Sequence, residues 1–193
     1  MTTANKISIF RILLVPVFVV VVLYYTQDGE EIYRLAAVLC FGIAAISDGV
    51  DGYIARRYNQ RSELGAILDP LGDKLLLVAG IVLLSLNNAP YLPRLPLWLV
   101  VTVVSRDVLI LIGLLVIKHA CDKVIVRPAM VGKAATVLLM ACILWALLKW
   151  SVVWLRWICL AAAVCTGVST VVYVVDGVRQ LSASPSSVAS PKQ

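Results

Sequence analysis

The chain has 193 residues, of which 61% are hydrophobic and only 15% are charged. A soluble domain carries charge on about a quarter of its residues, so this composition argues against a protein whose surface is solvated by water. The net charge of +6 does not indicate a nucleic-acid partner, because the basic residues lie between apolar stretches, where they set topology or meet anionic head groups. The composition therefore predicts an integral membrane protein.

The apolar stretches divide the chain into about six segments of the length that a membrane helix needs, roughly 20 residues. They cover approximately residues 7–25, 33–57, 68–86, 96–117, 130–148 and 152–175. We expect an all-α integral membrane domain of six transmembrane helices over residues 1–180. A disordered tail, 181–193, rich in Ser, Pro and Ala, is expected to follow. The first stretch lacks a small-residue cleavage site, so we expect it to be retained as a span.

The positive residues fall unevenly on the two sides that six spans would create. One side collects Lys6, Arg11, Arg56, Arg57, Arg61, Lys118, Lys123, Arg127 and Arg179. The other side has Arg34, Arg94, Lys149 and Arg156. By the positive-inside rule the first side, with both termini, is predicted to be cytoplasmic. A short chain without a transit peptide fits the inner membrane of a bacterial cell.

Four aspartates lie at helical spacing on either side of the loop between the second and third segments. Asp48 and Asp51 are three residues apart, and Asp69 and Asp73 are four apart, so each pair shares one face of its helix. Antiparallel neighbours can point all four carboxylates into one cavity on the cytoplasmic side. Ionised carboxylates near a membrane are costly unless they are paired or bound to metal, so solvated helix ends explain them poorly.

The chemistry of these ligands indicates the kind of ion. Carboxylate oxygens with no His or Cys nearby suit a hard cation such as Mg²⁺, Mn²⁺ or Ca²⁺. Two such ions can clamp a diphosphate and stabilise charge on its oxygens. Gly52 and Ala55 leave room for a ring or a diphosphate, and Arg56 can bond phosphate oxygens. The segment therefore predicts a divalent-metal site that acts on a diphosphate.

The segment resembles the CDP-alcohol phosphotransferase family, whose pattern reads D-x-x-D-G-x-x-A-R-x₈-G-x-x-x-D-x-x-x-D. Every fixed position is filled, by Asp48, Asp51, Gly52, Ala55, Arg56, Gly65, Asp69 and Asp73. The family core also has six helices, so the resemblance covers the whole membrane domain. It implies a metal-dependent enzyme of phospholipid synthesis, and a homodimer.

The resemblance implies a role for each matching position. Asp48, Asp51 and Asp69 would ligate a pair of Mg²⁺ or Mn²⁺ ions, with Asp73 able to reach one ion. Asp73 would also be the catalytic base that deprotonates the acceptor hydroxyl.

The remaining fixed positions would bind the nucleotide. Gly52 and Ala55 would border the cytidine, Arg56 would meet the nucleotide phosphates, and Gly65 would complete this part of the site. The acceptor alkoxide would attack the phosphorus that carries the lipid, and CMP would leave.

Further elements resemble one branch of the family, the phosphatidylglycerophosphate synthases and related cardiolipin synthases. The opening from Asn5 to Arg11, then Pro16, is similar to N-L-x-T-x-x-R-x-x-x-x-P, with Ile and Ser for the usual Leu and Thr. Asp69-Pro70-Leu71-Gly72-Asp73-Lys74 resembles D-P-x-x-D-K, with Gly72 where Ala is common.

Ser105-Arg106-Asp107 and Val131-Gly132-Lys133 resemble the later R-D and G-K elements of that branch. The resemblance implies that Arg106, Lys133 and Arg11 meet the acceptor's phosphate. Arg106 lies inside a span, so it should face a cavity. Asp107 is its alternative partner, although adjacent helix residues point apart. Lys133 and Arg11 have the alternative of reaching the membrane interface with their long side chains.

The main hypothesis is transfer of a phosphatidyl group from CDP-diacylglycerol to glycerol 3-phosphate. The alternative is a cardiolipin synthase that uses CDP-diacylglycerol and phosphatidylglycerol; inositol phosphate and serine fit the Asp-Pro and Asp-Lys context less well. A divalent-cation transporter is a remote alternative, because the aspartates cluster at one end of apolar spans and no inverted repeat is evident. A non-catalytic scaffold is disfavoured because no motif position is lost.

Overall fold

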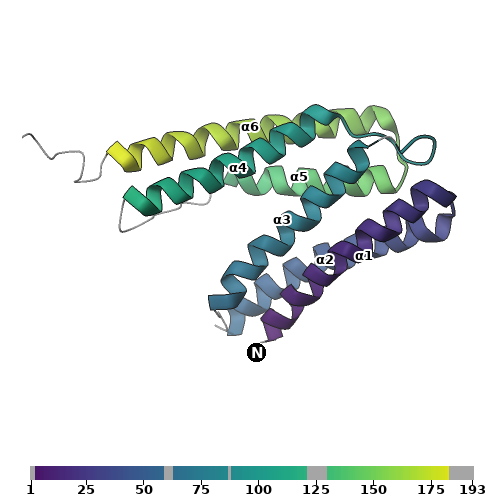
Figure 1. The fold of residues 1–193 in the computed structure, drawn as a ribbon, viewed down its shortest axis with the longest axis horizontal. Helices are drawn as coiled ribbons and strands as arrows, with labels where there is room; N and C mark the ends of the chain where they lie inside the picture. The colour runs from purple at the N-terminus through teal and green to yellow at the C-terminus, as the bar shows by residue number, and fades with distance from the viewer. Residues whose placement is uncertain (1–2, 59–62, 87, 121–129, 183–193) are drawn as a thin grey trace, which may run out of the picture.

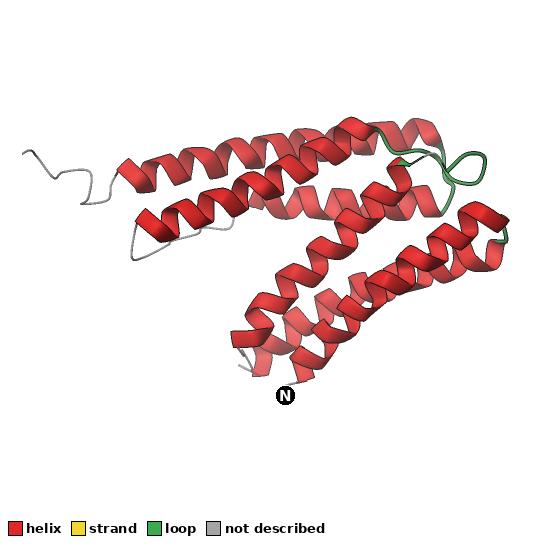
Figure 2. Cartoon of the chain, viewed as in Figure 1, coloured by secondary structure: helices red, strands yellow, loops and turns green. Residues whose placement is uncertain are grey.

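The computed structural model describes residues 3–58, 63–86, 88–120 and 130–182, with side chains for 9–47, 72, 74–86, 88–113 and 130–178. Within these residues the chain forms helices and no strand (Figure 2). The six helices are α1 (Thr3–Asp28), α2 (Glu31–Tyr58), α3 (Glu63–Ser85), α4 (Leu97–Ala120), α5 (Met130–Leu147) and α6 (Val152–Ser182). The predicted all-helical class is confirmed. The predicted tail lies outside the described residues from position 183 onward.

The helices form two packed groups (Figure 1). In the first group α1 packs on α2 and α3, and in the second α6 packs on α4 and α5. Contacts of α3 with α4 and α5 join the two groups. The α1–α2, α3–α4 and α5–α6 connections lie toward one end of the molecule, and the end of α2, the start of α3 and the end of α6 lie away from it (Figure 1).

Apolar side chains fill the contacts between helices and also cover the outside. Phe18 of α1 and Phe41 of α2 are buried, with ring centroids 5.8 Å apart. On α4, by contrast, Val101 and Leu111 are 63% and 60% exposed. An outer surface built of such residues needs hydrocarbon rather than water around it.

Three stretches of the described residues are long and apolar enough to cross a membrane: Ile9–Asp28, Met130–Leu147 and Val152–Val178. A shorter apolar helix covers Lys74–Ser85. These stretches and the exposed apolar surface identify a helical membrane protein. The six-span topology stays a prediction.

The α3–α4 connection supplies hydrogen-bond donors to carbonyls at the end of α3. The Asn88 side chain donates to the Leu83 carbonyl at 2.7 Å, and Arg94 Nε donates to the Ser85 carbonyl at 2.9 Å. The last carbonyls of an α-helix have no amide donor four residues further along the same helix. The bonds from Asn88 and Arg94 therefore fix where the chain leaves α3.

The α1–α2 and α5–α6 connections are joined by charges. Glu31 accepts a hydrogen bond from Lys149 Nζ at 2.9 Å and forms an ion pair with Arg34. Arg34 also donates to the Leu147 carbonyl at 3.2 Å. The bonds from Lys149 and Arg34 lower the pKa of Glu31 to about 2. These contacts join the start of α2, in the first helix group, to the end of α5 and the α5–α6 connection, in the second.

Candidate active site

The predicted aspartates lie in the two helices that flank residues 59–62. Asp48 and Asp51 belong to α2, and Asp69 and Asp73 belong to α3. Their side chains lie outside the described part of the chain, as do those of the predicted nucleotide-binding residues, Gly52, Ala55, Arg56 and Gly65. The side chains that the structure does describe hold no cluster of three or more His, Cys, Asp or Glu.

Arg11 lies against the acidic segment of α3. Its side chain is only 1% exposed, so it does not extend to the membrane interface. A β-carbon built on Gly72 would lie 3.7 Å from Arg11 Cδ, and Gly72 stands between Asp69 and Asp73 in the sequence. A buried guanidinium is stable only beside negative charge or hydrogen-bond acceptors. Arg11 therefore brings a buried positive charge to the stretch of α3 that carries two of the aspartates.

An ion pair joins α3 to α4 next to this segment. Lys74 Nζ lies 3.1 Å from Asp107 Oδ1. Lys74 follows Asp73 directly, and Asp107 follows Arg106, so the pair brings the D-P-L-G-D-K and S-R-D elements together. Asp107 thus forms its ion pair with Lys74 of α3 and not with Arg106, its neighbour in the sequence. Adjacent helix residues point apart, as expected.

Arg106 instead lies against the start of α5. A β-carbon on Gly132 would be 3.2 Å from Arg106 Nη2 and 3.1 Å from Ser169 Oγ. The Tyr173 hydroxyl would be 3.7 Å from the same point. Because Gly132 of α5 has no side chain, Arg106 of α4 and the hydroxyl groups of Ser169 and Tyr173 of α6 can lie close to it.

Two polar atoms of this cluster are buried without a hydrogen-bond partner among the described residues. They are Arg106 Nε and Ser169 Oγ. A buried donor with no acceptor is costly and rare in native proteins. The cluster of Arg106, Gly132, Ser169 and Tyr173 therefore has unused capacity to bind a ligand rich in oxygen acceptors.

The sequence had pointed to Arg106 and to the G-K element but not to Ser169 or Tyr173. The signal that could have found them is their spacing, because residues four apart share one helix face. Lys133 is exposed, and it forms no hydrogen bond or ion pair among the described side chains. Gly132, rather than Lys133, is the residue of the G-K element that contacts Arg106.

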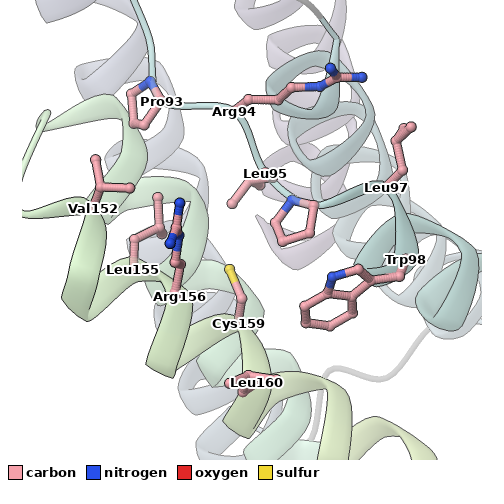
Figure 3. Close-up of a pocket in the computed structure, with 11 residues that line it drawn as sticks. Pro93, Arg94, Leu95, Leu97, Trp98, Val152, Leu155, Arg156, Cys159 and Leu160 are labelled. Atoms are coloured by element: carbon pink, nitrogen blue, oxygen red, sulfur yellow. The ribbon is translucent and has the colours of Figure 1, made fainter.

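A separate pocket of about 730 Å³ lies between the starts of α4 and α6. Figure 3 shows Trp98 on one side of it and Arg156, Cys159 and Leu160 of α6 on the other. None of the predicted site residues lines this pocket. It occupies the starting end of α6, whereas Ser169 and Tyr173 lie toward the other end of that helix.

Comparison with known proteins places the chain in a family. A model of the CDP-alcohol phosphatidyltransferase family matches residues 1–169. This range holds every fixed position of the aspartate motif, all of α1 to α5 and the first part of α6. The chain belongs to the CDP-alcohol phosphatidyltransferase family. The last residue matched is Ser169, so Tyr173 lies beyond the part that the family model covers.

Relatives within the CDP-alcohol phosphatidyltransferase family carry two kinds of name. The CDP-diacylglycerol–glycerol-3-phosphate 3-phosphatidyltransferase of Bacillus subtilis (strain 168) is 34% identical over 140 residues, which are 68% of this chain and 69% of that protein. The putative cardiolipin synthase of Mycobacterium tuberculosis (strain ATCC 25618 / H37Rv) is 38% identical over 136 residues, 70% of this chain and 59% of that protein. The Salmonella typhimurium enzyme with the first name is 36% identical over 104 residues, 54% of this chain and 53% of its own. The matches thus span from about half to about two thirds of these relatives.

Proposed function

We propose that this member of the family transfers a phosphatidyl group from CDP-diacylglycerol to glycerol 3-phosphate and releases CMP. The observation that carries the proposal is the half-buried Arg106, whose Nε is buried without an acceptor among the described residues and whose neighbour Asp107 is paired with Lys74. Its positive charge is therefore left for an anionic ligand, beside the helix that carries Asp69 and Asp73. An acceptor with a phosphate group supplies such a ligand. The name of the Bacillus subtilis relative supports this choice of acceptor.

The chemistry of the aspartate set fits a pair of divalent ions. Asp48, Asp51, Asp69 and Asp73 offer only carboxylate oxygens, which Mg²⁺ and Mn²⁺ prefer. We propose that these four residues hold two such ions. When bound, the ions would stabilise negative charge on the phosphoryl oxygens.

Each of the proposed site residues would have a separate role in the reaction. Asp73 would take the proton of the acceptor hydroxyl. The acceptor oxygen would form a bond to the phosphorus that carries the diacylglycerol, and the bond from that phosphorus to the CMP oxygen would break. Arg56 would hold the nucleotide phosphates, and the small residues at Gly52 and Ala55 would leave room for the cytidine.

The basic residues would hold the acceptor in place. Arg106 would bind the acceptor phosphate directly, and the exposed Lys133 would attract it on entry. Arg11, buried against Gly72, would act from the α1 side of α3.

We place this site on the cytoplasmic side of an inner membrane, with six spanning helices, cytoplasmic termini and two copies of the chain in the working enzyme. The uneven distribution of positive residues supports this orientation. Labelling of single cysteines at residue 2 and in the α5–α6 connection, from outside intact cells, tests it: only the second should react.

Cardiolipin synthesis is the second candidate function. The identity of 38% to a putative cardiolipin synthase is slightly higher than the 34% and 36% to the two glycerol-3-phosphate enzymes. The same arginine would then face the phosphodiester of phosphatidylglycerol.

The deciding experiment measures CMP release by the purified protein. It is incubated with CDP-diacylglycerol, Mg²⁺ or Mn²⁺ and one acceptor at a time: glycerol 3-phosphate, phosphatidylglycerol, inositol phosphate or serine. Release with glycerol 3-phosphate, abolished by EDTA and reduced at least about 10²-fold in Asp73→Asn, is the expected result. Release with phosphatidylglycerol alone would replace the main function with the second. Absence of release with every acceptor would refute both.

A further inference from the structure

The hydroxyl groups of α6 do not all behave alike. A Ser or Thr in a membrane helix commonly bonds a carbonyl of its own helix, which removes the cost of burying its hydroxyl. Thr166 donates to the Ala162 carbonyl at 2.7 Å, and Thr170 donates to the Thr166 carbonyl at 2.8 Å. Ser169 is completely buried, yet its Oγ has no such bond among the described residues. Its hydroxyl faces the neighbouring helices instead.

The place that Ser169 faces is shared with other polar groups. Ser169 Oγ, Arg106 Nη2 and the Tyr173 hydroxyl would lie 3.1, 3.2 and 3.7 Å from a β-carbon on Gly132. Real β-carbons are rarely within 3.4 Å of such atoms. A side chain at position 132 would therefore displace the groups that surround it, and glycine keeps them in position.

The charge of this cluster favours an anion. Arg106 contributes a positive charge and a buried Nε donor that has no acceptor among the described residues. The nearby carbonyl of Gly132 already accepts a hydrogen bond from Thr136 Oγ1, at 3.1 Å. Asp107 is paired with Lys74. Among the described residues the cluster therefore holds more donors than acceptors, and none of their carboxylates pairs with Arg106.

We propose that Ser169 and Tyr173 are ligands of the acceptor's phosphate group and set the specificity for a phosphate-bearing acceptor together with Arg106. Both hydroxyls donate hydrogen bonds to phosphate oxygens, and the Arg106 guanidinium supplies the opposite charge. Gly132 leaves the space for these groups. The proposal rests on the proposed phosphatidyl transfer for the identity of the ligand, but the binding of a phosphate ion can be measured without turnover.

The kinetic test compares three variants with a matched control. Ser169→Ala, Tyr173→Phe and Gly132→Ala should each raise the KM for glycerol 3-phosphate about 10-fold or more, because a hydrogen bond to a charged group is lost or displaced. The KM for CDP-diacylglycerol should stay within about 2-fold. Thr170→Val removes a hydroxyl that bonds its own helix and should leave both values unchanged. The KM of the same variants for phosphatidylglycerol as acceptor shows whether the cluster also binds a phosphodiester.

The binding test uses inorganic phosphate alone and thermal unfolding in detergent. Phosphate should raise the Tm of the wild type and of Thr170→Val. It should raise the Tm of Ser169→Ala and of Tyr173→Phe much less, because each variant has lost a ligand of the phosphate. If no acceptor supports CMP release but this pattern holds, the proposed function fails and the phosphate site stands. Equal phosphate protection of all variants, or unchanged KM values in Ser169→Ala and Tyr173→Phe, would overturn the inference and leave Ser169 a packing residue.

Discussion

Three glycines of this chain differ in how far the structure requires them. Gly29 has φ of 72°, and a β-carbon there would lie 2.3 Å from the Tyr91 ring. Gly132 has an ordinary helical backbone but polar neighbours that would be displaced. Gly72 has only ordinary contacts around it, with Ile12 Cγ1 3.4 Å from a built β-carbon. Of these three glycines, Gly72 is therefore the one that the structure does not require.

The residue-scale prediction follows from that difference. Gly72→Ala should stabilise the protein by about 0.5–1 kcal/mol, because alanine costs less backbone entropy within α3 and its methyl group only makes van der Waals contacts. The Tm in detergent should rise by about 1–4 °C, with CMP release retained. Gly29→Ala is the comparison variant, and its Tm should fall. A lower Tm for Gly72→Ala would show that Arg11 or Ile12 cannot tolerate the methyl group.

At the scale of the elements, the end of α3 depends on side chains from the connection that follows it. Asn88 is only 7% exposed and donates to the Leu83 carbonyl. The position of α3 matters for the site, since this helix carries Asp69 and Asp73 at one end and pairs with α4 through Lys74. The connection thus holds the far end of the helix that positions two aspartates.

Asn88→Ala should destabilise the protein by about 0.5–1.5 kcal/mol, because it removes a buried hydrogen bond to the Leu83 carbonyl, which then keeps only the longer bond from the Leu86 amide. The expected Tm decrease is about 1–6 °C. Gln27→Ala, at an exposed position, serves as the control and should unfold at the wild-type temperature. An unchanged Tm for Asn88→Ala would mean that water or a lipid group replaces the amide donor.

The agreement between predicted and observed helices also belongs to this scale. The stretches predicted at 130–148 and 152–175 correspond to α5 and the larger part of α6, because a continuous apolar run marks a membrane helix directly. The third stretch was predicted from residue 68, but α3 begins at Glu63. Glu63, Asp69 and Asp73 lower the average hydropathy over the first turns of α3, so hydropathy alone places the start of this helix too late. The helix bounds were therefore predictable within a few residues where the polar ends are short.

Contacts between helices were not predictable in the same way. The sequence indicates that Arg106 faces inward, but only the rotation of α4, α5 and α6 decides that it meets Gly132 rather than Lys133. The four-residue spacing of Ser169 and Tyr173 was the only signal for Ser169, and it was weak because a serine within a span ordinarily bonds its own helix. The spacing of the four aspartates was recognisable from the chain alone, since helical periodicity places them on common faces.

At the scale of the whole molecule, the cluster of Glu31, Arg34 and Lys149 is one charged link between the two helix groups, beside the ion pair of Lys74 and Asp107. Lys149 reaches from the α5–α6 connection, and Arg34 bonds both Glu31 and the end of α5. The Lys149 ammonium also lies 5.1 Å from the centre of the Tyr25 ring. Hydrogen bonds to Tyr25 and Glu31 raise the pKa of Lys149. Glu31 itself is exposed, so the contribution of the cluster to stability is small and depends on salt.

The pH dependence of this link has a definite sign. The pKa of Glu31 is lowered from 4.5 to about 2 on folding, so its contribution is complete above pH 4.5 and is lost as the pH falls toward 2. Glu31→Gln should therefore lower the Tm slightly at pH 7, and the difference from the wild type should shrink between pH 4.5 and pH 2. Parallel melting curves for the two proteins measure this. A Tm difference that persists at pH 2 would show that the side chain acts through packing and not through its charge.

The ion pair between Lys74 and Asp107 has a consequence for how this sequence can change during evolution. Asp107 is adjacent to Arg106 in the sequence, and its negative charge is compensated by the ammonium group of Lys74. Loss of Lys74 would free an acidic group beside the arginine, so a substitution on α3 would weaken acceptor binding through α4. Positions 74 and 107 are therefore expected to change together in related chains, and a neutral residue at one should be tolerated best with a neutral residue at the other.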